Sequence, residues 1–111
     1  MLDSKVAADH TTAERLQQLA ELYERGQVSP LMQRTLQKLL AYEAEVCRTH
    51  LAELRQDLVA FEQQYGWSSE EFRQRYESGQ TDDRMDYVEW VSLIKMADNL
   101  KARLRLLTGE A

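Results

Sequence analysis

The sequence predicts an all-α protein, and three observations support this class. Apolar residues recur at spacings of three and four over long stretches, as on one face of a helix. The four glycines and the single proline lie between these stretches rather than inside them, and helix-start residues follow the gaps. We expect four helices, with a long central one at about 30–65 and a long C-terminal one at about 83–108 packed as a helical hairpin or bundle. Short helices are expected at about 12–25 and 69–78.

Composition limits the chain to one small domain. It has 111 residues, of which 43% are hydrophobic and 30% charged, which is enough for one core. We expect a flexible tail over residues 1–10 and a single helical domain over 11–111. No apolar run approaches the roughly 20 residues of a membrane span, and the first ten residues lack the apolar centre of a secretion signal, so we expect a cytoplasmic location. The net charge of −5 disfavours nonspecific binding to nucleic acid and suits a basic partner.

The first predicted helix begins with a capping box and ends at a glycine. Thr11 and Glu14 have the spacing of such a box, and Gly26 follows the last apolar position. The apolar face consists of Leu16, Leu19, Ala20 and Tyr23. A short connection then leads into the second helix, so we expect the first helix to fold back antiparallel on it.

The second predicted helix is the longest element, and the others are expected to pack on it. Ser29 is a typical N-cap and Pro30 suits the first helical position. No glycine follows until Gly66, so the helix would run roughly 54 Å at 1.5 Å per residue. Its apolar seam, with a period near 3.5, consists of Leu40, Ala44, Cys47, Leu51, Leu54, Leu58, Phe61 and Tyr65.

This helix is longer than the helices beside it, so part of the seam should remain uncovered. An exposed apolar strip of that kind is a typical association site. We therefore predict a homodimer, and the residues expected to make the contact are Leu40, Cys47, Leu51, Leu54 and Leu58.

The third predicted helix follows the second almost at once. Gly66 can adopt the left-handed conformation that ends a helix, and Ser68 with Glu71 repeats the capping-box spacing. Phe72 and Tyr76 share one face and are expected to anchor this short helix to the core.

The fourth predicted helix begins after a run of acidic residues and ends at Gly109. Thr81, Asp82 and Asp83 are candidates for its N-cap, and Asp86 adds negative charge where the helix dipole favours it. Its apolar positions are Tyr87, Trp90, Val91, Leu93, Ile94, Ala97, Leu100, Leu104 and Leu107.

Catalytic and metal-binding patterns are weak in this chain. Glu43, Cys47 and His50 share a helical face, but a structural zinc site needs four ligands. Carboxylates three residues apart could hold magnesium in a helical nucleotide hydrolase, and the candidate pairs are Glu21 with Glu24 and Asp83 with Asp86. Helix surfaces form such pairs by chance. Neither a glycine-rich phosphate loop nor a Ser/His/Asp arrangement is evident, so we expect no enzyme, no cofactor and no metal.

One segment resembles a known family. The pattern is similar to that of small bacterial and archaeal helical proteins, and it consists of Phe61-Glu62, then Tyr65-Gly66-Trp67-Ser68-Ser69-Glu70-Glu71-Phe72, then Gly79, Asp82-Asp83, Asp86-Tyr87 and Glu89-Trp90. Many of these proteins resemble the antitoxin component of two-gene toxin–antitoxin modules. The resemblance implies a noncatalytic protein that binds and neutralises a cognate toxin. The alternatives from the residues themselves are a coiled-coil dimeric adaptor and the carboxylate-metal hydrolase.

The charge distribution suggests where a partner would bind. Residues 62–90, here called the elbow, contain eight acidic and three basic residues, a net charge of −5. Aromatic residues within a charged rim are common in protein interfaces. We therefore predict that a basic toxin surface docks on the elbow, and the residues expected to bind it are Trp67, Tyr76, Asp82, Asp83, Asp86, Tyr87, Glu89 and Trp90.

Overall fold

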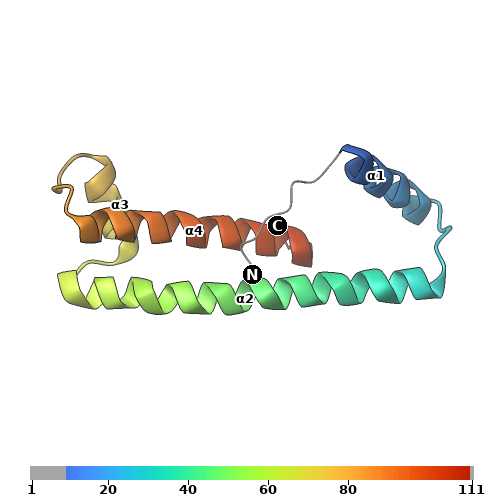
Figure 1. The fold of residues 1–111 in the computed structure, drawn as a ribbon, viewed down its shortest axis with the longest axis horizontal. Helices are drawn as coiled ribbons and strands as arrows, with labels where there is room; N and C mark the ends of the chain where they lie inside the picture. The colour runs from blue at the N-terminus through green and yellow to red at the C-terminus, as the bar shows by residue number, and fades with distance from the viewer. Residues whose placement is uncertain (1–9, 111) are drawn as a thin grey trace. The chain divides into compact units, whose positions relative to one another are not determined.

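The computed structural model describes residues 10–110, which form four helices and no strand. The helices are α1 (His10–Glu24), α2 (Pro30–Tyr65), α3 (Ser69–Glu77) and α4 (Met85–Thr108) (Figure 1). The predicted all-α class, with two long and two short helices, is confirmed. The tail expected at 1–10 falls almost entirely outside the described residues, but its last member, His10, begins α1.

The chain divides into two compact units, one ending at Leu40 and the other beginning at Ala41, and α2 runs through both. In the first unit α1 ends at Glu24, and Gly26 two residues later has a φ of +68°, the left-handed conformation. The N–H of Gly26 donates to the carbonyl of Tyr23. Thr11 lies inside α1 and is not its cap, because the helix begins at His10, two residues earlier than predicted.

The start of α2 follows the prediction. The hydroxyl of Ser29 accepts a hydrogen bond from the N–H of Met32 at 3.1 Å, which satisfies one of the free amides at the helix start. From Pro30 the helix continues without interruption to Tyr65.

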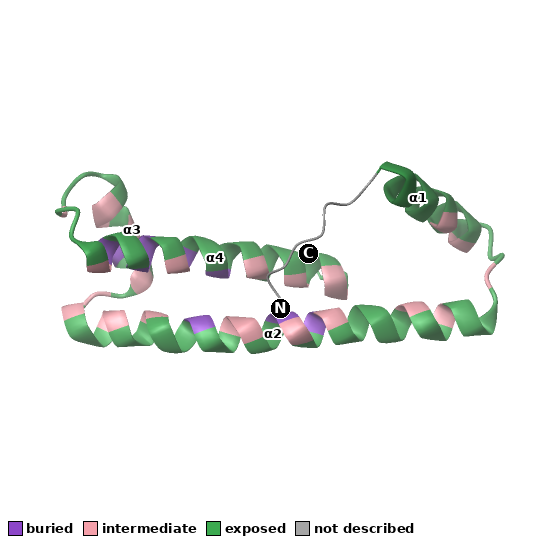
Figure 2. Ribbon diagram, viewed as in Figure 1, coloured by how far each residue is buried: buried purple, intermediate pink, exposed green. Residues whose placement is uncertain are grey.

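The core lies in the second unit, where the later part of α2 packs antiparallel to α4. Phe61 stacks on Trp90 near one end of this pair, and the Arg103 guanidinium donates to Glu43 at 3.1 Å near the other. Figure 2 shows buried positions on both helices. The buried residues are Ala44, Cys47, Leu54, Phe72, Tyr87, Trp90, Val91, Ile94 and Ala97.

The turn from α2 into α3 is held by two capping contacts. Gly66 has a φ of +75°, and Ser68 is the N-cap of α3, as predicted. The Ser68 hydroxyl accepts from the N–H of Glu71 at 3.1 Å, and the Glu62 carboxylate accepts from the N–H of Ser69 at 2.8 Å. Glu62 therefore joins the end of α2 to the start of α3.

The start of α4 differs from the prediction. Its N-cap is Arg84, which makes no side-chain capping bond, and the helix begins at Met85 rather than at 83. The Asp82 carboxylate instead accepts from the backbone N–H of Arg84 at 3.1 Å and from its guanidinium at 2.9 and 2.8 Å. Asp82 thus closes the turn before the helix. Its carboxylate cannot also cap α4, because the hydrogen bonds within the turn and the capping bond compete for the same oxygens.

Candidate functional site

The elbow is built around a cluster of aromatic rings. Phe72 of α3 and Trp90 of α4 stack nearly parallel, with ring centroids 4.0 Å apart and an angle of 3° between the planes. The indole Nε1–H of Trp90 donates to the Ser69 hydroxyl at 3.0 Å, which satisfies the buried donor. The other rings packed against this pair are Phe61, Tyr65, Trp67, Tyr76 and Tyr87.

This cluster corrects part of the predicted partner-binding set. Trp90 is 0% exposed and Tyr87 is 5% exposed, because both lie on the side of α4 that faces α2 and α3. Neither ring can anchor a partner on this surface. Trp67 and Tyr76 are half-buried, and the Arg75 guanidinium lies 5.1 Å from the Trp67 ring centre. The aromatic residues of the elbow are therefore mainly core residues.

Asp86 ties the end of α2 to the start of α4. The Tyr65 hydroxyl donates to an Asp86 carboxylate oxygen at 2.6 Å, and the Arg84 guanidinium lies 4.6 Å from the Tyr87 ring centre. The hydrogen bond to Asp86 is the main cause that raises the pKa of Tyr65 above its ordinary value, and desolvation adds to it.

Asp82 has a structural role beside this contact. The hydrogen bonds from the Arg84 side chain, followed by that from its backbone N–H, lower the pKa of Asp82 to about 2. Both Asp82 and Asp86 thus hold the turn together, whereas the sequence had suggested that they contact a partner.

The remaining acids of the elbow separate into paired and free groups. Arg73 bonds Glu70 and Asp98, while Arg75 bonds Glu71. Three acidic residues of the elbow are exposed and form no ion pair with any residue in 10–110, and they are Glu77, Asp83 and Glu89. Glu77 was not among the predicted site residues. Glu70 and Glu71 pair with arginines of their own helix, whereas Arg73 also reaches Asp98 on α4.

The predicted self-association seam is largely covered within one chain. Cys47 and Leu54 are buried in the second unit, and Leu51 and Leu58 are half-buried. Leu40 is the exposed member of the five. This burial has a simple cause, since α4 lies along the middle of the seam and covers its buried members within one chain.

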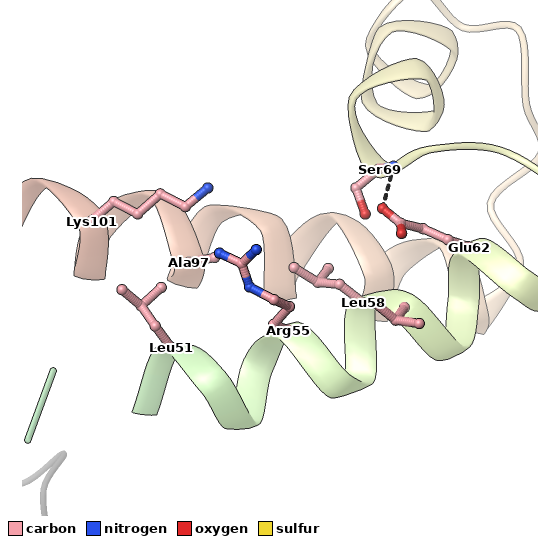
Figure 3. A pocket seen from close by; sticks show the side chains of 8 residues that line it. Leu51, Arg55, Leu58, Glu62, Ser69, Ala97 and Lys101 are labelled. Atoms are coloured by element: carbon pink, nitrogen blue, oxygen red, sulfur yellow. Dashed lines mark hydrogen bonds between the residues drawn. The ribbon is translucent and has the colours of Figure 1, made fainter. Parts of the chain in front are cut away.

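A groove of about 240 Å³ lies on the second unit. Figure 3 shows Leu51, Arg55 and Leu58 on α2 opposite Ala97 and Lys101 on α4. The cationic side chains of Arg55 and Lys101 make no ion pair within the described residues. Its remaining lining residues are Val59, Glu62 and Ser69. This volume is below the roughly 300–1,000 Å³ of typical ligand pockets, so the groove has the size of a side chain rather than of a cofactor.

The metal-binding pattern on α2 is not assembled into a cluster. Glu43 is bonded to Arg103 and Cys47 is buried. In the described part of the chain, no three His, Cys, Asp or Glu residues come together as they would to hold a metal ion. Asp83 and Asp86, the predicted carboxylate pair, differ in their contacts: Asp86 accepts the hydrogen bond from Tyr65, whereas Asp83 is exposed.

Two further findings concern the whole described chain. Across residues 10–110 no helix combines the length and the apolar character needed to cross a membrane. No family model, curated protein or solved structure matches this chain.

Proposed function

We propose that this chain is a noncatalytic protein that binds a basic partner protein through the elbow and thereby neutralises it. One observation carries the proposal: Glu77, Asp83 and Glu89 are exposed and unpaired, within the described residues, on a segment of net charge −5. Complementary charges of this kind mainly raise the association rate and discriminate against wrong partners. We therefore assign to these three acids the attraction of the partner.

The contacts below the acids support the same proposal, because they order the elbow before binding. The Glu62–Ser69 bond links α2 to α3, the Tyr65–Asp86 bond links α2 to α4, and the Ser69–Trp90 bond links α3 to α4. A surface that is already ordered loses less conformational entropy on association. The elbow thus presents its charges in a defined arrangement.

The partner that we propose is a cognate toxin with a basic surface, in the cytoplasm. Its support is the sequence resemblance, strongest over residues 61–90, which implies an antitoxin-like role. The adaptor alternative would use the same acidic surface without inhibiting anything. Growth of the native host distinguishes the antitoxin-like role from the adaptor role. For an antitoxin, expression of the captured partner alone should arrest growth, and co-expression of this chain should restore it.

The elbow is tested by neutralising its free acids in the combined variant Glu77→Gln, Asp83→Asn and Glu89→Gln. Asp82 is left intact because its carboxylate closes the turn before α4. Association with the partner captured from the native host, followed by stopped-flow fluorescence, should slow, and its dependence on salt should flatten. The helical content should equal that of the parent.

The matched control changes the same charge outside both the elbow and residues 10–40, in the variant Glu53→Gln, Asp57→Asn and Glu110→Gln. These acids are exposed and have no ion pair within residues 10–110. The control should keep the parental rate and salt dependence. Equal effects of the two variants, or no effect of the elbow variant, would place the binding surface elsewhere.

A further inference from the structure

The described part of the first unit consists of α1, the connecting turn and the start of α2, and these residues 10–40 are here called the N-terminal hairpin. Its apolar side chains are not packed into a buried core. None of its residues is buried, and Figure 2 shows α1 only as exposed and intermediate. Leu31 is 67% exposed, Leu16 is 57% exposed and Leu39 is 53% exposed. The other exposed large hydrophobic residues are Leu22, Met32 and Leu40. Helices of this length are marginal in water unless an apolar face is packed.

The charges of the N-terminal hairpin are divided between its two helical segments. On α1 there are three glutamates and one arginine, a net charge of −2, with His10 counted as neutral. On residues 30–40 of α2 there are Arg34 and Lys38 and no acid, a net charge of +2. Glu21 pairs with Arg25 in the connecting turn, but neither Arg34 nor Lys38 has an ion pair among the described residues. Each hairpin therefore offers one acidic and one basic segment.

We propose that the N-terminal hairpin is the homodimer contact, in which α1 of one copy packs on residues 30–40 of the other. A two-fold contact uses the same patch on both chains, so the patch must be complementary to itself. The hairpin is complementary to itself both in its charges and in its apolar side chains. Its opposite charges pair across the axis, and its six exposed apolar side chains form the shared interior of a four-helix arrangement.

A second copy fits this surface better than the basic partner proposed for the elbow does. Such a partner would be attracted by the acids of α1 but repelled by Arg34 and Lys38, which have no ion pair within the described residues, whereas a second copy complements both segments. The dimer is independent of the elbow, because the two surfaces share no residue. It also differs from the long-helix seam considered first, of which only Leu40 is exposed.

The apolar part of the contact is tested by light scattering on the full chain at tens of micromolar. The parent should have the mass of a dimer, and Leu16→Glu with Leu39→Glu should have that of a monomer. Both tryptophans lie in the second unit, so an unchanged Trp emission spectrum shows that this variant keeps the core. Val88→Glu with Met96→Glu, which changes exposed apolar residues of α4, should remain dimeric.

The charge part is tested with two opposite reversals. Arg34→Glu with Lys38→Glu makes both segments acidic, and Glu14→Lys with Glu24→Lys makes α1 basic as well as residues 30–40. Each variant alone should be monomeric, and an equal mixture should restore the dimer mass. A monomeric parent, a dimer that survives Leu16→Glu with Leu39→Glu, or a mixture that stays monomeric would overturn the proposal. Failure of this contact would leave the elbow's partner binding unchanged, so the two proposals are separable.

Discussion

Replacement of Phe72 by alanine tests whether the aromatic cluster holds α3 against the two long helices. The Phe72 ring is 0% exposed and lies 4.0 Å from Trp90, 5.2 Å from Tyr87 and 5.6 Å from Tyr76, measured between ring centroids. Truncation of a buried phenylalanine to alanine costs about 3–5 kcal/mol. An aromatic pair contributes about 0.5–1.5 kcal/mol beyond its buried area, which places this variant in the upper part of that range.

The assay is urea unfolding followed by Trp fluorescence and by far-UV circular dichroism. A domain of this size has a free energy of unfolding of about 5–15 kcal/mol, so the variant should unfold at a much lower urea concentration than the parent. Tyr42→Ala is the control, since its side chain is 65% exposed and surface substitutions usually change stability by less than about 0.5 kcal/mol. If Phe72→Ala and Tyr42→Ala lowered the free energy of unfolding by similar amounts, the Phe72 ring would not be central to the fold.

Three further predictions concern the elbow. Ser69→Ala should destabilise the protein by about 1–3 kcal/mol in urea unfolding, because it leaves the buried Nε1–H of Trp90 without its acceptor; an unchanged midpoint would show that another group accepts this bond. Gly66→Ala should lower the free energy of unfolding by about 1–2 kcal/mol, because a side chain strains the left-handed backbone at this position. No atom lies within 4 Å of the added Cβ, so the cost comes from the backbone and not from a clash. The Gly66→Asn variant should lose less stability, because asparagine also ends helices in this conformation. The lowered pKa of Asp82 implies that its stabilising contribution is present above the ordinary value of 3.8 and is lost as the pH falls toward about 2. Carboxyl NMR should therefore show the pKa of Asp82 rising toward 3.8 in Arg84→Gln, and an unchanged titration would contradict the assigned cause.

The helices and their ends could be predicted because their signals are local. Ser29 before Pro30 and Ser68 before α3 are caps in the structure, and Gly26 and Gly66 end the helices before them in the left-handed conformation. These features depend on neighbours only a few residues away in the chain. The error at Asp82 has the same origin, since two local uses of one carboxylate compete and the sequence pattern does not rank them.

The seam of α2 was also predictable as a packing face, but the residue that covers each position was not. Helical periodicity shows which side of a helix is apolar, whereas the neighbour that buries it is set by the packing of distant segments. Cys47 and Leu54 are thus buried in the same chain, while Leu39 remains exposed. Tyr87 and Trp90 likewise belong to the core and not to a binding surface.

The sequence by itself determined the helical class, the order of the helices and the acidic character of the elbow, because composition, periodicity and capping act within short stretches of chain. Only the tertiary structure decided which charges and apolar side chains stay free. Arg73 reaches Asp98 across 25 residues of sequence, and Tyr65 reaches Asp86 across 21. Such contacts satisfy some groups and leave others, such as Glu77, without an ion pair within residues 10–110, because these long-range pairs depend on distance in space and not on distance along the chain.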